Sequence, residues 1–200
     1  MPVSYTPPMD VAELERQIEQ KFAPGPLLAV QGLANTYDFE DDEELLLDPA
    51  ATRAWLIRTG LATEDVEVGE AEYERLREFR TVVRSLLENN LHPGEASVDL
   101  GGLGRFAELG IPLRVGPGGE LELDMDPAAD VDAVIAQMLG AIHAAQLSGD
   151  WSRLKICNAD DCRWAFFDAS KNRGGQWCSM EVCGNRTKNR RYRAARSGEG

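Results

Sequence analysis

The sequence predicts an α+β protein, in which a mainly helical N-terminal domain with a small β-hairpin element precedes a compact cysteine-bearing domain. Three observations predict this division. Apolar residues recur at three- and four-residue steps in two long segments before residue 149. All four cysteines lie between residues 157 and 183. Residues 151–200 hold 11 Lys/Arg and 5 Asp/Glu, a balance of +6, whereas residues 1–150 hold 10 Lys/Arg and 29 Asp/Glu, a balance of −19.

The overall composition is that of a soluble globular protein, with 43% hydrophobic and 28% charged residues in a chain of 200. Its formal net charge of −13 argues by itself against nucleic-acid binding. The N-terminus lacks the basic and apolar regions of a secretory signal, and no stretch reaches the roughly 18 apolar residues of a membrane span. We therefore expect a cytoplasmic protein with no membrane partner, in which disulfide bonds are disfavoured.

Composition divides the chain into four segments: an N-terminal segment over 1–26, a helical domain over 27–149, a basic cysteine domain over 150–196 and a disordered tail over 197–200. The first segment contains a short helical pattern from about residue 10 to 22. The helical domain opens with a compact apolar stretch, and an acidic run follows it over residues 38–44. We interpret this acidic run as a solvated loop.

Three helices and one hairpin are predicted in the rest of the helical domain. Asp48 and Pro49 suit the N-cap and the first position of a helix that ends at Gly60. A longer helix runs over 70–90. The turn "GPGGE" joins two short apolar strands in a hairpin. Asp126-Pro127 repeats the N-cap signal before the last helix, which ends at "LSGD".

The four cysteines form two pairs with the spacing C-x4-C, separated by fifteen residues. Such pairs predict a structural zinc site, because zinc takes four thiolates in a tetrahedron and each pair supplies two corners from one tight turn. We expect one zinc ion held by Cys157, Cys162, Cys178 and Cys183. A closed four-cysteine site leaves no open position for a substrate, so the ion is structural. Two disulfides, or four free buried cysteines, are the alternatives.

The segment between the cysteine pairs has the pattern of a hairpin closed near "KNRGG", with Trp164 before the turn and Trp177 after it. Ser179 suits the N-cap of a following helix, and Glu181 suits its first turn. A cysteine knuckle, a hairpin and a helix that carries the last ligand together form the plan of a treble-clef zinc finger.

The segment "CNADDCRWAFFDASKNRGGQWCSMEVCGNRTKNRRYR" resembles the CGNR zinc finger, whose tetrapeptide stands here at residues 183–186. The region before it, through "LANTYDF" with Asn35-Thr36, is similar to the helical ABATE domain. Together the two resemblances cover most of the chain after residue 26. They imply a bacterial stress-induced transcription regulator that binds zinc and DNA, and they imply neither a target sequence nor a ligand.

A basic helix is predicted after the last cysteine. On a helical wheel of about 100° per residue, one stripe contains Arg186, Asn189, Arg190, Arg193 and Arg196. Arginine and asparagine are the side chains that contact guanine and adenine edges. Phosphate contacts are expected from residues elsewhere on the helix and in the "KNRGG" turn, namely Lys188, Arg191, Lys171 and Arg173. The alternatives are a solvated helix end and a helix docked on the acidic domain.

The wheel also places Cys183 close to this stripe, so that Arg186 could lie over the zinc site instead of facing DNA. Asn35 and Thr36 could line a pocket, and we interpret them as helix caps. His92 and His143 are interpreted as structural residues.

We predict a zinc-dependent DNA-binding transcription regulator whose larger domain senses a small-molecule ligand or forms a homodimer. The alternative is a protein-interaction adaptor in which zinc only shapes a binding surface. The sequence shows no Ser/His/Asp or Cys/His set, and we expect no enzymatic activity.

Overall fold

The computed structural model describes residues 21–95, 98 and 100–197. These residues are mainly helical and include three two-stranded antiparallel sheets, which confirms the predicted α+β class. The disordered tail predicted over 197–200 is wrong at residue 197, which still belongs to the C-terminal helix, and residues 198–200 lie outside the described part of the chain. Nearly all of the predicted helix over 10–22 lies outside it as well. In the part of the chain that the structure describes, no helix is long and apolar enough to cross a membrane.

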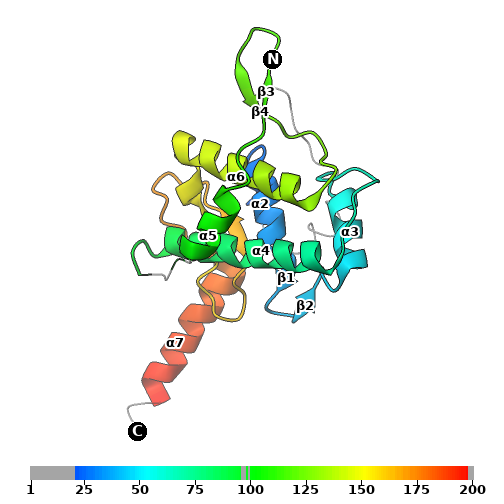
Figure 1. Cartoon of the computed structure of the whole chain (residues 1–200). Coiled ribbons are helices and arrows are strands. Elements are labelled where there is room, and N and C mark those ends of the chain that lie inside the picture. Colours follow the sequence, from blue (N-terminus) through cyan, green and yellow to red (C-terminus); the bar gives the residue numbers. More distant parts are fainter. Residues whose placement is uncertain (1–20, 96–97, 99, 198–200) are drawn as a thin grey trace.

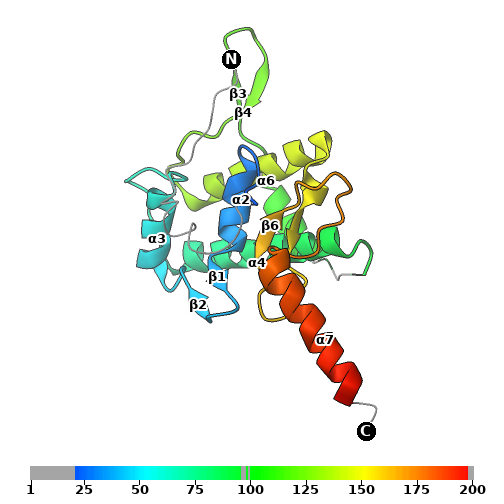
Figure 2. The same ribbon diagram turned by 180° about the vertical axis from the view of Figure 1, so that it is seen from behind.

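Three helices form the core: α2 (Leu27–Ala34), α4 (Glu70–Leu91) and α6 (Val131–Ser148). α2 crosses behind α4 and α6 in Figure 1 and lies in front of them in Figure 2, so that it is covered by both. Six of its eight residues are buried. A short helix with almost no polar face has no periodic pattern, which is why its apolar stretch did not indicate a helix.

The predicted helices at 48–60 and 70–90 are confirmed as α3 (Pro49–Arg58) and α4. The Asp48 carboxylate caps α3, because its Oδ1 accepts a hydrogen bond from the backbone N–H of Ala51 at 2.7 Å. Along α4, apolar side chains at the predicted spacing are buried, among them Leu76, Phe79 and Val83.

A second helix that was not predicted, after α2, is α5 (Leu100–Ala107). Three of its eight residues are glycines, which lower helix propensity by about 1 kcal/mol each relative to alanine. Phe106 at its end packs edge-to-face on Phe79, with ring centroids 5.1 Å apart. Packing on α4 therefore stabilises a helix that its own sequence disfavours.

The last helix of this part, α6, begins later than predicted. Its N-cap is Asp130, whose Oδ1 accepts from the backbone N–H of Ala133 at 2.8 Å. The Asp126-Pro127 start is wrong because Ala128 exchanges backbone hydrogen bonds with residues 61 and 63, which holds this segment in a bridge instead of a helical turn. α6 ends as predicted, with Gly149 in the left-handed conformation at φ 81°.

Two short hairpins lie at different ends of the molecule (Figure 1). β3 (Leu113–Val115) and β4 (Leu121–Leu123) form the predicted hairpin, which projects beyond α6. β1 (Tyr37–Asp38) and β2 (Glu43–Glu44) enclose most of the acidic run. The solvated-loop interpretation is therefore only partly correct: Asp41 is exposed, but Glu44 forms a two-pronged ion pair with the buried Arg80.

The strands β5 (Leu154–Ile156) and β6 (Ala165–Phe167) flank the first cysteine pair and pair with each other. The predicted hairpin closed near "KNRGG" is therefore wrong, because β6 pairs with the strand before the cysteines. β5 packs on α4, and Leu154, Ile156 and Ala165 belong to the main hydrophobic core. Burial of β5 against α4 decides this pairing. The treble-clef plan in detail, and the domain boundary after residue 149, stay predictions.

Candidate metal centre and basic helix

The four cysteine sulfurs converge on one point. They lie within 4.8 Å of one another, and all four thiols are free and buried. The Sγ atoms of Cys162 and Cys178 are 3.6 Å apart, and those of Cys178 and Cys183 are 3.5 Å apart. Sulfurs about 2.3 Å from a tetrahedral zinc ion are about 3.8 Å from each other, whereas a disulfide requires about 2.05 Å. The cluster fits one structural zinc ion, as predicted.

Local backbone geometry presents the sulfurs. In the first pair, Cys157 N–H donates to Trp164 O at 2.8 Å and Cys162 N–H donates to Ala159 O at 2.9 Å, which closes a tight knuckle between β5 and β6. The knuckle ends at Arg163, whose φ of 52° lies in the left-handed region. These hydrogen bonds hold two ligands at the same end of one hairpin.

The second pair flanks the start of the helical turn η2 (Met180–Gly184): Cys178 lies just before it and Cys183 lies within it, and α7 (Asn185–Ser197) follows. As predicted, Ser179 caps this turn, with its Oγ accepting from Val182 N–H at 3.2 Å. Gly184 is required by packing: a Cβ there would lie 2.7 Å from Cδ1 of Trp177. The glycine lets η2 approach the tryptophan closely enough to bring Cys183 into the cluster.

The ionisation of the cysteines favours a bound cation. Without metal, hydrogen bonds from Cys162 and Cys178 lower the pKa of Cys157, while donating them raises the pKa of both donors. Burial and the nearby Cys157 raise the pKa of Cys183. Only one of the four thiols therefore ionises readily by itself. A divalent cation removes this penalty, because it compensates the charge of the remaining thiolates.

A buried asparagine of the helical part holds the metal-bearing hairpin. The side-chain amide of Asn35 donates to Ala165 O at 2.9 Å and accepts from Ala165 N–H at 2.7 Å. The amide thus pairs with both backbone groups of Ala165 on the free edge of β6, as the backbone of a neighbouring strand would. Gln31 adds a third bond to the same carbonyl at 3.0 Å. The cap interpretation is confirmed for both residues at the end of α2: Asn35 is its C-cap residue, with its backbone N–H donating to Gln31 O at 3.1 Å, and the Thr36 hydroxyl donates to Leu33 O. The Asn35 side chain takes no part in the cap, because it is bonded to β6.

Replacing Asn35 with alanine is expected to lower the free energy of unfolding by about 2–4 kcal/mol, because it leaves a buried N–H of β6 without its partner. The measurement is urea unfolding of the zinc-loaded protein. Asn189→Ala is the control, since it makes the same chemical change on the exposed face of α7. Equal stability of the two variants would show that the Asn35 contact contributes nothing.

A buried ion pair holds the segment that follows β6. Lys155 Nζ lies 2.9 Å from Asp168 Oδ2, and both side chains are almost fully buried. The ammonium also donates to Arg173 O at 2.6 Å, and the carboxylate accepts from the N–H groups of Gly175 at 2.7 Å and Ser170 at 3.0 Å. The pair therefore organises the backbone of residues 168–175 before the second cysteine pair.

The predicted DNA-contacting residues lie in two places. Figures 1 and 2 show α7 projecting away from the rest of the molecule, and it carries Arg186, Lys188, Asn189, Arg190, Arg191, Arg193 and Arg196. Lys171 and Arg173 lie on a separate loop. Arg173 donates to Gly149 O at 3.2 Å, at the C-terminal end of α6, where a cation is favoured by the helix dipole. The structure thus does not gather all nine residues on one surface.

Within α7, Arg186 differs from the exposed residues 188–190. Its guanidinium forms an ion pair with Glu40 of the β1–β2 loop and lies 3.4 Å from Asp161. It also lies 3.7 Å from Cys183 Sγ, over the cluster, as the helical wheel suggested. The hydrogen bond with Glu40, with Asp161 adding to it, raises the pKa of Arg186.

Sequence reasoning did not identify Glu40 and Asp161 as members of this site. Asp161 had one available signal, its position inside the knuckle next to Cys162. Glu40 had none, because 146 residues separate it from Arg186.

Two family models match the chain. The ABATE model, described as "Putative stress-induced transcription regulator", matches residues 29–155, which is more than half of the chain. The CGNR zinc finger model matches residues 153–196 and therefore includes all four cysteines and most of α7. No curated protein matches the chain.

Proposed function

The chain belongs to the ABATE family and ends in a CGNR zinc finger, and from this premise we propose that it is a zinc-dependent transcription regulator that binds DNA through α7. The family description supports regulation of transcription. The zinc ion has a structural role in this proposal: it fixes the base of α7 against the knuckle.

The observation that carries the proposal is the contrast between α7 and the remainder of the chain. Residues 185–197 hold six Lys/Arg and no Asp/Glu in a protein whose net charge is −13. The helix projects from the body, and Lys188, Asn189 and Arg190 on it are exposed. A projecting helix with these side chains suits the major groove of duplex DNA, which admits one α-helix.

The helical domain supplies the regulation in this proposal, by forming a homodimer or by binding a small-molecule ligand. The β3–β4 hairpin supports a protein contact, because Leu113, Val115 and Leu121 share one exposed face. A cavity of about 290 Å³ between the end of α4 and the knuckle supports a ligand site. Its lining includes His92, Asn158 and Arg163.

The proposal includes no catalytic activity, because the four thiols converge on one another as metal ligands and are not available as nucleophiles. It places the protein in the cytoplasm of a bacterial cell, where a transcription regulator meets DNA. A protein-interaction adaptor is the second candidate, favoured by the same exposed apolar face of the β3–β4 hairpin.

DNA selection from a random pool with the zinc-loaded protein tests the proposal. We expect enrichment of a duplex site and an affinity that falls steeply with salt. Lys188→Ala is expected to weaken binding to the selected and the scrambled duplex alike, and to reduce the slope of log affinity against log salt by about one.

Arg58→Ala on α3 is the matched control for Lys188→Ala, because it removes the same charge from an exposed position away from α7. Lys171→Ala reports whether the loop beside α6 takes part. No binding at low salt by the zinc-loaded protein, or equal slopes for all variants, would favour the adaptor.

A further inference from the structure

Asp161 connects the metal-bearing knuckle to two arginines of α7. It lies immediately before Cys162, and its Oδ2 is 2.8 Å from Arg190 Nη2 and 3.4 Å from Arg186 Nε. Arg186 and Arg190 are one helical turn apart and therefore share a face of α7. The zinc site thus sets not only where α7 begins but also where one carboxylate lies against this face.

The two arginines are engaged to different extents. Arg186 donates from both terminal nitrogens to Glu40, its Nε lies 3.4 Å from Asp161 Oδ2, and its side chain is 29% exposed. Among the described residues, Arg190 has a single ion-pair partner, Asp161, reached through Nη2, and its side chain is 55% exposed. A guanidinium has five N–H donors, so Arg190 retains donors for a bidentate contact, whereas those of Arg186 are largely taken up within the protein.

We propose that Asp161 is a positioning residue for the DNA contact, which holds the Arg190 guanidinium toward a base edge, while Arg186 links the knuckle to the β1–β2 loop and does not contact DNA. This inference rests on the proposed function of α7. A bidentate arginine contact to guanine requires a fixed plane of the guanidinium, and an arginine that is already oriented loses less rotamer freedom on binding.

A carboxylate beside a DNA-binding helix also has a cost, because it repels phosphate. Removing its charge therefore has two separable effects. Affinity for any duplex rises through the lost repulsion, and discrimination falls because Arg190 is no longer held. A residue with a merely structural role would not produce this combination of higher affinity and lower discrimination, since loss of structure lowers the affinity for all duplexes together.

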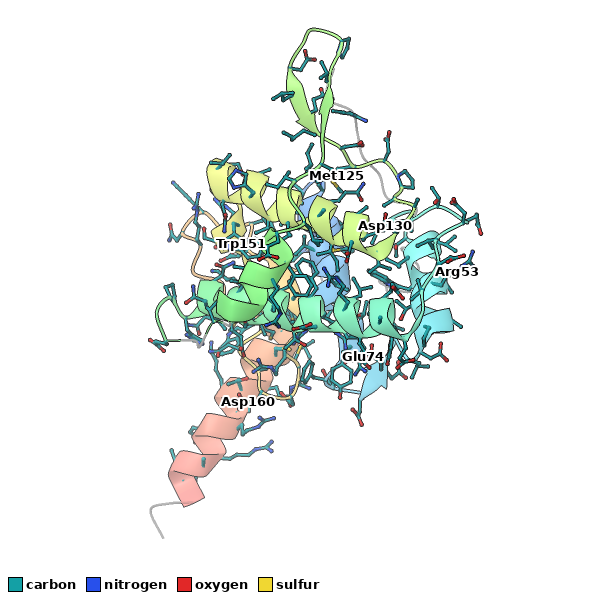
Figure 3. All side chains as sticks on the ribbon, viewed as in Figure 1. Arg53, Glu74, Met125, Asp130, Trp151 and Asp160 are labelled. Carbon is teal, nitrogen blue, oxygen red and sulfur yellow. The ribbon has the colours of Figure 1, made fainter. Side chains whose placement is uncertain are left out.

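The experiment compares Asp161→Asn with Asp160→Asn in the full-length, zinc-loaded protein. Asp160 lies next to Asp161 in the same loop, near the base of α7 in Figure 3, and within the described residues no ion pair involves it. The two variants change the charge equally at adjacent positions. Each is titrated at fixed salt against the selected duplex and its scrambled form, with zinc content measured in parallel.

We expect Asp161→Asn to reduce the ratio of the two affinities about tenfold, which is the discrimination carried by one good base contact. We expect Asp160→Asn to leave this ratio unchanged, and zinc to stay bound in both. In an Arg190→Ala background, Asp161→Asn should cause no further loss of discrimination, because the two side chains act as a unit.

The unaltered protein could bind DNA while Asp161→Asn and Asp160→Asn show the same ratio of affinities for the selected and the scrambled duplex. This result would overturn the positioning role of Asp161 and leave the proposed function standing. Loss of zinc from Asp161→Asn together with weaker binding to both duplexes would also overturn it, and would assign Asp161 a structural role. Failure of the unaltered protein to bind any duplex would instead overturn the proposed function itself.

Discussion

The purified protein is expected to contain one zinc ion per chain, and Cys183→Ser is expected to abolish zinc binding. The other three sulfurs remain close together, but they no longer complete the tetrahedron that a structural zinc site requires. In small metal-bound modules the binding free energy, on the order of 10 kcal/mol or more at neutral pH, is also folding free energy. This is the largest effect that we expect from one substitution.

The loss of structure in Cys183→Ser is expected to be confined to the second half of the finger. β5 and β6 pack in the main core and are held by Asn35, so they should stay folded without metal. η2 and α7 have no comparable core and should become disordered. Metal analysis gives the zinc content, and amide hydrogen exchange locates the change: protection should be lost over residues 177–197 and kept in α4 and α6.

Reversible chelation of the unaltered protein is the control for this result. Removing zinc with a chelator should reproduce the exchange pattern of Cys183→Ser, and added zinc should restore protection in the unaltered protein but not in the variant. The zinc assignment would be contradicted if protein prepared without oxygen contained no metal and both cysteine pairs formed disulfides.

The second-largest effect is expected from Asp168→Ala. This change leaves the Lys155 ammonium buried without its counter-ion, and breaking such a pair costs about 3–5 kcal/mol. It also removes the acceptor of the Ser170 and Gly175 N–H groups. Urea unfolding of the zinc-loaded protein measures the loss. Asp160→Ala, which removes an exposed carboxylate that forms no ion pair with any described residue, should change stability by less than about 0.5 kcal/mol.

A double variant separates the charge from the packing. Lys155→Met with Asp168→Leu removes both charges, and we expect it to be more stable than Asp168→Ala alone, because no unpaired charge stays buried. A double variant as unstable as the single one would show that the hydrogen bonds to residues 170–175, and not the unpaired charge, dominate the loss.

The same pair predicts a pH dependence. Burial disfavours the charged form of Asp168, but hydrogen bonds from Ser170, Lys155 and Gly175 outweigh it and hold the pKa of the carboxyl well below its usual range. The stabilisation is therefore complete above the pKa of an unfolded aspartate, about 3.9, and is lost as the pH falls below that value. Asp168→Ala should lack this part of the acid sensitivity.

Local patterns in the sequence predicted the metal site and the longest helices. Each C-x4-C pair requires only a tight turn to bring its two sulfurs together, and the repeat of the pair indicates four ligands of one ion. The spacing of Leu76, Phe79 and Val83 identifies a buried face without reference to any partner. α2 and α5 escaped prediction for opposite reasons. α2 is buried on nearly all sides and has no period, and α5 is rich in glycine and depends on the contact between Phe106 and Phe79.

The sequence by itself determined the zinc ligands, the class of fold and the charge of the C-terminal helix, because each follows from residues close together in the chain. Only the tertiary structure decided that β6 pairs with β5, that Asn35 holds the edge of β6, and that Arg186 is bound by Glu40. Each of these contacts joins residues separated by intervals that no local period encodes. The backbone groups of β6 are buried and must find partners when the core forms, which selects β5 and Asn35. Arg186 and Glu40 instead meet near the surface, where their opposite charges attract.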